Sequence, residues 1–138
     1  MKGYKIGINA DLTDFVLIEL DIPEAYPGFK IYKHKVTTIE DPRMVNYYRA
    51  NVARVLNIRK YNSGTAEYVD AAFSLYDENF YYHSGEIIYP DSFDPNPYAV
   101  CTNGIHFFDN AKDAINYEKD EWARYKYQCS IISKIMNW

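Results

Sequence analysis

Hydrophobic and polar residues alternate along much of the chain with the two-residue period that is typical of β-strands. Residues 4–9 and 13–22 are the first two segments of this kind, and the turn-like residues 9–11 between them predict an antiparallel hairpin. The second segment has one fully apolar face, and Pro23 ends it because proline has no N–H to donate to a neighbouring strand. The chain therefore begins with strands that bury one side.

Four further segments are predicted as strands from their β-branched and aromatic residues: 29–38, 53–59, 86–89 and 105–108. A helix is the alternative for 53–59, and residues 65–75 show no clear period. Residues 90–97 contain three prolines, which excludes a regular element there and predicts a rigid, acidic loop. Loops of this kind often form the rim of a binding pocket.

Two or three helices are predicted. Residues 41–48 begin with Asp-Pro, in which aspartate can act as N-cap and proline fits the first helical position. Another helix would begin at Asp109 or Asn110 and carry an apolar stripe. Residues 121–136 fit both a helical stripe and strand alternation, and we favour a C-terminal helix because a strand would need a break near Lys119.

Together these elements predict a single α+β domain over residues 1–138. Its architecture would be a mostly antiparallel, curved sheet with two or three helices, one of them C-terminal. With 138 residues, of which 48% are hydrophobic, the chain is long enough to bury a core without disulfides or metals.

The composition narrows the range of partners. A net charge of −4 disfavours binding to duplex DNA, because that affinity depends on lysine and arginine neutralising phosphates. No apolar segment approaches the roughly 20 residues that cross a bilayer, and the first residues lack the apolar core of a signal peptide. We therefore expect a cytoplasmic protein that binds neither nucleic acid nor membranes. Its 15 tyrosines suit a ligand pocket or an interface, although A/T-rich codon usage also produces them.

Residues that could catalyse a reaction or hold a metal are scattered. Two cysteines and three histidines lack the spacing of a zinc site, and the six glycines do not form a phosphate-binding loop. Glu86, Asp91 and Asp94 are close in sequence, but such carboxylates are typical of a solvated loop. We therefore expect no metal, no cofactor and no catalytic group, and a packing role for Cys101.

Three motifs lie at specific spacings along the chain. Residues 49–58 read Arg-Ala-x-x-Ala-x-Val-Leu-x-Ile, and residues 74–94 read Ser-x-Tyr-Asp-x-x-Phe-x-Tyr-x-x-Gly-Glu-x-x-x-Pro-Asp-x-Phe-Asp. Residues 101–108 read Cys-x-x-Gly-Ile-His-Phe-Phe. Together they resemble a small uncharacterised domain of large DNA viruses and phages over about residues 4–120, which leaves 121–138 as a C-terminal extension. The resemblance implies a viral or phage protein of the host cytoplasm, and it brings no established activity.

A second likeness is confined to residues 104–107 and 114–117. Gly-Ile-His-Phe followed by Ala-Ile-Asn-Tyr is similar to the Gly-Ile-Tyr-Phe strand and the next helix of poly-ADP-ribose polymerases. This likeness implies a pocket for the nicotinamide and ADP-ribose parts of NAD. The chain departs from that family, because His83-Ser84-Gly85 only loosely matches its His-Gly-Ser motif and no glutamate is clearly placed on a late strand. A nucleotide-shaped pocket without chemistry therefore fits better than a transferase.

Eight residues are candidates for a ligand site because they offer aromatic rings, positive charge or a helix start. Rings can stack on a base, arginine can pair with phosphate, and a helix N-terminus attracts anions. The candidates are His106, Phe108, Tyr76, Tyr82, Tyr89, Arg49, Arg54 and Asn110. Each could instead have an ordinary packing or surface role, so the most specific hypothesis is a pocket wall formed by His106 and the helix start after it.

From these patterns we expect a non-enzymatic accessory protein that binds and sequesters a small nucleotide-like ligand, such as a host defence signal. One alternative is a protein that inhibits a host factor by direct interaction. Another alternative is an ADP-ribosyltransferase-like enzyme. The apolar side chains of residues 122–138 also predict a homo-oligomer, unless this segment packs against the sheet of its own chain.

Overall fold

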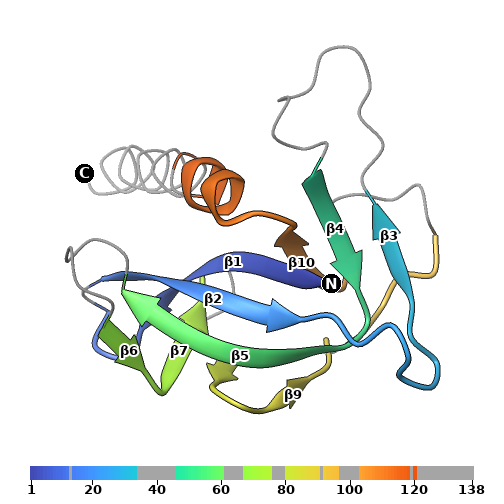
Figure 1. The fold of residues 1–138 in the computed structure, drawn as a ribbon, viewed down its shortest axis with the longest axis horizontal. Coiled ribbons are helices and arrows are strands. Elements are labelled where there is room, and N and C mark those ends of the chain that lie inside the picture. Colours follow the sequence, from blue (N-terminus) through green and yellow to red (C-terminus); the bar gives the residue numbers. More distant parts are fainter. Residues whose placement is uncertain are drawn as a thin grey trace, which may run out of the picture.

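The computed structural model describes residues 1–12, 14–33, 46–60, 67–75, 80–90, 92–96, 103–118 and 120. Among these residues, one helix follows the last strand, beginning at residue 111 and described through residue 118 and at residue 120 (Figure 1). The strands are β1 (Lys2–Asn9), β2 (Phe15–Asp21), β3 (Ile31–Lys33), β4 (Tyr47–Ala50), β5 (Ala53–Lys60), β6 (Glu67–Val69), β7 (Ala71–Ser74), β8 (Tyr81–His83), β9 (Ile87–Ile88) and β10 (Ile105–Phe108).

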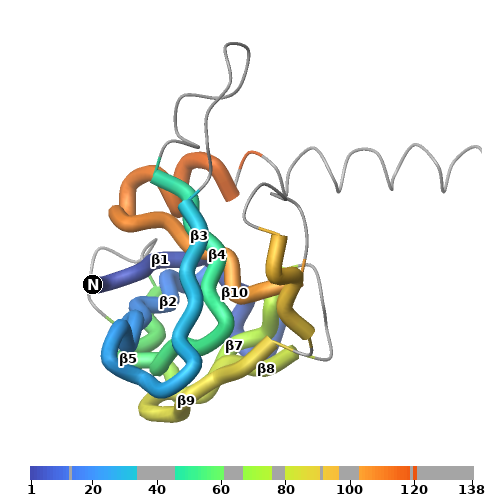
Figure 2. The backbone as a smooth tube through the Cα atoms, turned by 90° about the vertical axis from the view of Figure 1, so that its right-hand side faces the viewer, coloured from blue at the N-terminus to red at the C-terminus, as the bar shows by residue number. Residues whose placement is uncertain are grey.

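All strand pairs among the described residues are antiparallel, and the continuous chain from β6 to β7 closes them into a ring. β1 pairs with β2, β2 with β5, and β5 with β6. Asp70 alone separates β6 from β7, and β7 pairs with β1. β8 pairs with β7 and β9 pairs with β5, so both join the ring. The sheet therefore curves into a small barrel, and β10, β4 and β3 extend it beyond β1 (Figure 2).

Apolar side chains fill the inside of this barrel. The buried cluster consists of Val16, Ile18, Leu20, Ile22, Ala50, Ala53, Val55, Ile58, Ala72, Tyr82, Ile88, Ile105 and Phe107. Burying one large apolar side chain stabilises a fold by about 1.5–3 kcal/mol, so a cluster of this size is a main source of stability. Three of its members alternate along β2, which confirms the apolar face predicted for residues 13–22.

β1 faces this core with two glycines and a lysine. Opposite residues of an antiparallel pair share a face, so Gly3, Lys5 and Gly7 point inward with the core residues of β2. A Cβ atom on Gly7 would lie 2.7 Å from the carbonyl oxygen of Phe73, so a larger residue would displace the backbone there. Lys5 therefore places an amino group on the face that otherwise holds the apolar core.

The helix covers the outer face of the sheet. Ala114 is fully buried against Phe108, and Ile115 packs against Ile6 and Leu17. These contacts confirm the apolar stripe that the sequence predicts after Asn110.

The start of the helix agrees with its predicted N-cap. The side-chain oxygen of Asn110 accepts a hydrogen bond from the amide of Asp113 at 2.9 Å. Asn46, just before β4, donates a hydrogen bond of 2.8 Å to the carboxylate of Asp113. The first turn of the helix is therefore tied to the sheet.

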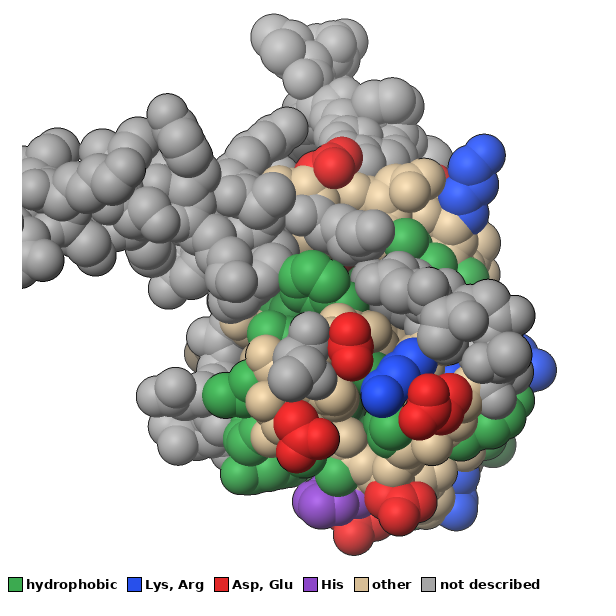
Figure 3. All heavy atoms as spheres, turned by 90° about the vertical axis from the view of Figure 1, so that its left-hand side faces the viewer, with side chains coloured by type: hydrophobic (Ala, Val, Ile, Leu, Met, Phe, Trp, Pro, Cys, Tyr) green, Lys and Arg blue, Asp and Glu red, His purple; other side chains and the backbone are tan. Residues whose placement is uncertain are grey.

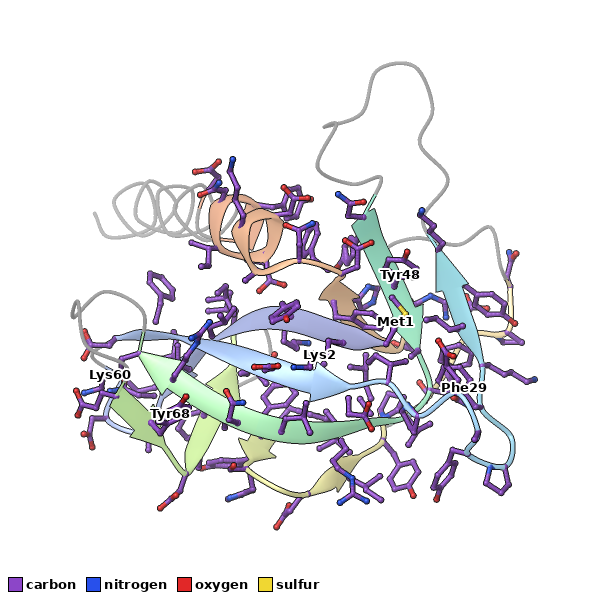
Figure 4. The ribbon with its side chains drawn as sticks, in the orientation of Figure 1. Met1, Lys2, Phe29, Tyr48, Lys60 and Tyr68 are labelled. Atoms are coloured by element: carbon purple, nitrogen blue, oxygen red, sulfur yellow. The ribbon has the colours of Figure 1, made fainter. Side chains whose placement is uncertain are left out.

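The predicted curved, mostly antiparallel sheet is confirmed, but the prediction of two or three helices is wrong for the described residues, which contain one. Tyr47 and Tyr48, predicted as a helix end, begin strand β4. Tyr48, which is labelled on β4 in Figure 4, pairs with Phe107 on one side and with Lys33 on the other. Its ring stacks on that of Phe107, with centroids 5.4 Å apart. Pairing on both sides outweighs the local helix signal. Residues 41–45 and 121–138 lie outside the described residues.

The described surface is mixed in character. Acidic, basic and hydrophobic side chains lie next to one another on the face shown in Figure 3. Among the described residues, no helix has the length and apolar character needed to cross a membrane.

Candidate functional site

Two strands share one edge of β1 and leave a gap between them. Tyr4 pairs with Phe108 of β10, and the last three residues of β1 pair with β7. Within the described part of the chain, Lys5 and Ile6 have no strand partner on this edge. We call this gap, at Lys5 and Ile6 between β10 and β7, the seam.

Glu118, near the end of the described helix, reaches into the seam. Its Oε2 atom accepts a hydrogen bond of 2.6 Å from the amide N–H of Ile6. A buried N–H needs an acceptor, and here a side-chain carboxyl group takes the place of a neighbouring strand's carbonyl. Because Glu118 is only 6% exposed, this acidic group is enclosed between the helix and β1.

Lys5 approaches the seam from the inner face of the sheet. Its side chain is buried, and its Nζ atom lies 5.0 Å from the centre of the Tyr82 ring in a cation–π contact. Burial alone would lower the pKa of Lys5, but Tyr82 and the Glu118 carboxylate together outweigh burial and hold the pKa above its ordinary value. Lys5 is therefore a buried positive charge at neutral pH.

For Glu118, in contrast to Lys5, burial has a larger effect on the pKa than the neighbouring groups do. Burial raises the pKa of Glu118 to about 7, although the charge of Lys5 and the N–H of Ile6 favour the ionised form. The carboxyl group therefore gains and loses its proton near neutral pH. Ionisable groups perturbed in this way are candidates for a functional site when they also line a cavity.

A cavity of about 350 Å³ lies at the seam. Lys5 and Tyr82 belong to its inner wall, whereas Tyr47 and His106 lie on the outer face with the helix, so residues from both faces of the sheet line the cavity. Its described lining residues are Lys5, Ile6, Tyr47, Ser74, Leu75, Phe80, Tyr82, Pro90, Ser92, Asn103, Gly104, Ile105, His106 and Glu118.

The lining combines charge with aromatic rings. Lys5 and Glu118 supply opposite charges, and the rings of Tyr47 and His106 meet edge to face with centroids 5.4 Å apart. Such a combination can hold a planar ring beside an anionic group.

Two of the eight predicted ligand residues, His106 and Tyr82, line this cavity. Phe108 lies behind the lining, where it is fully buried and stacks on Tyr47 with centroids 4.7 Å apart. Asn110 caps the helix that carries Glu118 and is absent from the described lining. His106 therefore lies at the cavity whereas the helix start at Asn110 does not, and a role of either residue in binding a ligand stays a prediction.

Arg49 is buried, and its side chain binds the backbone of residues 94–96 and 103, which precede β10; we call this set of contacts the clamp. Its guanidinium group lies 4.8 Å from the centre of the Phe93 ring and 5.1 Å from that of Tyr32. Its Nη atoms donate hydrogen bonds of 2.6, 2.8 and 3.1 Å to the backbone carbonyls of Asp94, Asn96 and Asn103. Since Asn103 lines the cavity, this clamp shapes the rim.

The remaining predicted residues lie elsewhere. Arg54 is exposed on β5, and Tyr89 is exposed with its hydroxyl hydrogen-bonded to that of Tyr26. Neither is part of the described lining. Tyr76 lies outside the described residues.

Sequence reasoning missed the two charged residues at the seam. Lys5 falls inside the predicted strand 4–9, but no local pattern shows that two later strands share its edge. One usable signal is its place between Gly3 and Gly7 on the inward face of β1. Glu118 follows directly after the apolar stripe of the helix, where an ordinary surface charge is expected.

Comparison with known proteins gives one match. The model of a family of unknown function, DUF5758, matches residues 1–114, which include every described lining residue of the cavity except Glu118. No curated protein and no solved structure matches the chain.

Proposed function

The chain belongs to the DUF5758 family, and we propose that it binds and sequesters a small nucleotide-like ligand in the cavity at the seam. One observation carries the proposal: a buried lysine, Lys5, contributes its charge to a cavity that is also lined by aromatic rings. Arginine or lysine next to an aromatic surface is the usual way in which proteins hold a phosphate attached to a ring.

The size of the cavity favours one ring and one anionic group. Ligand pockets usually measure about 300–1,000 Å³, and the volume of about 350 Å³ lies near the lower end of that range. A mononucleotide therefore suits the cavity better than a dinucleotide such as NAD.

The polar groups of the lining suit the two parts of such a ligand. Lys5 would pair with the phosphate on the inner side, and Tyr47 with His106 would border the ring on the outer side. Ser74 and Asn103 add side chains that can donate or accept hydrogen bonds.

The finer part of the proposal is a viral or phage protein that removes a host defence signal. It rests on the motif resemblance of residues 49–58, 74–94 and 101–108. Sequestration would need tight binding and no chemistry. The enzymatic alternative stays a prediction that nicotinamide release from NAD would test. The predicted homo-oligomer also stays a prediction, since residues 122–138 lie outside the described residues.

Thermal unfolding with a panel of AMP, cyclic AMP, cyclic GMP and ADP-ribose tests the proposed binding. At least one compound should raise the midpoint, because a ligand at 100 times its Kd stabilises the folded state by about 2.7 kcal/mol. Lys5→Met keeps the length of the side chain and removes its charge, so it should weaken binding roughly 30-fold, the value of a charge-assisted hydrogen bond.

The matched control for this experiment is Arg54→Met, which removes an exposed charge away from the cavity. It should bind like the wild type. No midpoint shift with any compound, or equal binding by the Lys5→Met variant, would count against the proposal.

A second candidate function is protein binding by the outer face of β5 and β9. Leu56, Ile87 and Tyr89 are 38%, 37% and 52% exposed, and exposed apolar patches often mark interaction sites. If this face binds a host factor, the double variant Leu56→Lys, Ile87→Lys should retain less of that factor from a host lysate than the wild type does. Equal retention by both proteins would argue against this candidate.

A further inference from the structure

Two groups at the seam attract an anion: the amide N–H of Ile6 and the ammonium group of Lys5. The Glu118 carboxyl group lies close to both. The amide N–H of Ile6 donates to Glu118 at 2.6 Å, and the ammonium group of Lys5 lines the same cavity, where its charge favours the ionised carboxylate. A phosphate entering the cavity would seek Lys5, because this residue is a buried cation. Glu118 therefore competes with the anionic part of a ligand for the charge of Lys5.

The titratable groups that line the cavity together with Glu118 lie on four strands. Lys5 lies on β1, Tyr82 on β8, His106 on β10 and Tyr47 on β4. Glu118 is the only carboxyl group among the described lining residues, and Lys5 is the only lysine or arginine. Ionised Glu118 and protonated Lys5 balance each other, so a bound anion would leave an excess negative charge in a buried space.

Resting on the proposed function, we infer that the ligand's anionic group binds Lys5 in exchange for the charge of Glu118, so that Glu118 takes up a proton when the ligand binds. In this exchange, solvent supplies one proton to the Glu118 carboxylate. The ligand's anion replaces that carboxylate as the counter-ion of Lys5. Glu118 then remains as a neutral carboxylic acid, which can still accept the hydrogen bond from Ile6.

The pKa of about 7 makes this exchange accessible in the physiological range. At pH 8 most free protein would carry an ionised Glu118, so binding must include protonation. The affinity should therefore fall by up to about tenfold for each pH unit above 7. His106 lines the same cavity, so its contribution has to be separated from that of Glu118 by substitution.

Calorimetric titration at pH 8 in two buffers of different ionisation enthalpy tests the exchange, with AMP and inorganic phosphate as probes. The wild type should take up close to one proton per AMP bound. Glu118→Gln should take up none through this site and bind AMP about tenfold tighter at pH 8, because the amide mimics the protonated acid. His106→Gln should retain the uptake, and inorganic phosphate should show the same proton coupling at lower affinity.

The outcomes separate the two proposals. If AMP binds the wild type and Glu118→Gln with equal affinity and equal proton uptake at pH 8, the exchange is overturned while the binding proposal stands. If neither probe binds either protein at pH 6 or pH 8, both the exchange and the mononucleotide assignment fall.

Discussion

Replacing Arg49 by alanine should lower the free energy of unfolding by about 3 kcal/mol. Arg49 is 3% exposed, and its guanidinium group donates hydrogen bonds to three backbone carbonyls of the segments around residues 94–96 and 103. The alanine variant would remove these three hydrogen bonds, although the Asn103 carbonyl keeps a second donor, the amide of Asp94, and it would remove the contacts with the rings of Phe93 and Tyr32. The loss would also release the rim of the cavity.

Urea unfolding measures the first effect, and limited proteolysis at residues 92–96 measures the second. Arg54→Ala is the matched control, since Arg54 is exposed, and it should change stability by less than about 0.5 kcal/mol. Arg49→Lys should recover only part of the loss, because an ammonium group cannot reach three carbonyls as the guanidinium fork does. Equal stability of Arg49→Ala and Arg54→Ala would show that the clamp does not hold the loop.

The second large effect is a dependence of stability on pH that comes from Glu118. Its pKa is raised to about 7 in the folded chain from an ordinary value of 4.5, so the folded state holds the proton more tightly than the unfolded state. The stabilisation is fully present below about pH 4.5 and is lost as the pH rises through 7. The total loss is on the order of 3 kcal/mol.

Urea unfolding of the wild type and Glu118→Gln between pH 4.5 and 8 measures this dependence. The difference between the two proteins should change across this window, and the variant should be the more stable protein at pH 8. Glu19→Gln is a control of opposite sign, because the hydrogen bond from Lys2 lowers the pKa of Glu19 on the surface. The variant should be slightly less stable than the wild type at neutral pH, and this small difference should change only at acidic pH, where Glu19 itself would take up a proton. Parallel curves for the wild type and Glu118→Gln would contradict a buried, titrating Glu118.

Strong local patterns predict much of the sheet. The alternating residues 13–22 contain β2, and the β-branched residues 53–59 lie in β5. Both strands were predictable because each has one apolar face, and that face is buried in the core. The failures occur where the pattern is short. β6 and β7 lie in residues 65–75, whose unclear period reflects a strand that bends at Asp70 between two partners.

The candidate site was predictable only in part. His106 and Tyr82 are predictable as ligand candidates because each places a ring with a polar atom in an apolar segment, and both line the cavity. Lys5 and Glu118 could not be found in this way, since their significance depends on the seam between β10 and β7. That gap arises from long-range pairing, which neither residue's neighbours in sequence reveal.

Titration of isotope-labelled protein with AMP, followed by amide chemical shifts, tests the binding claim most directly. Binding at the seam predicts the largest shifts at Ile6, Tyr82 and His106, which surround the cavity, and their loss in Lys5→Met. Shifts concentrated instead at Leu56 and Ile87 on the outer face of β5 and β9, or no shifts at all, would contradict the cavity as the ligand site.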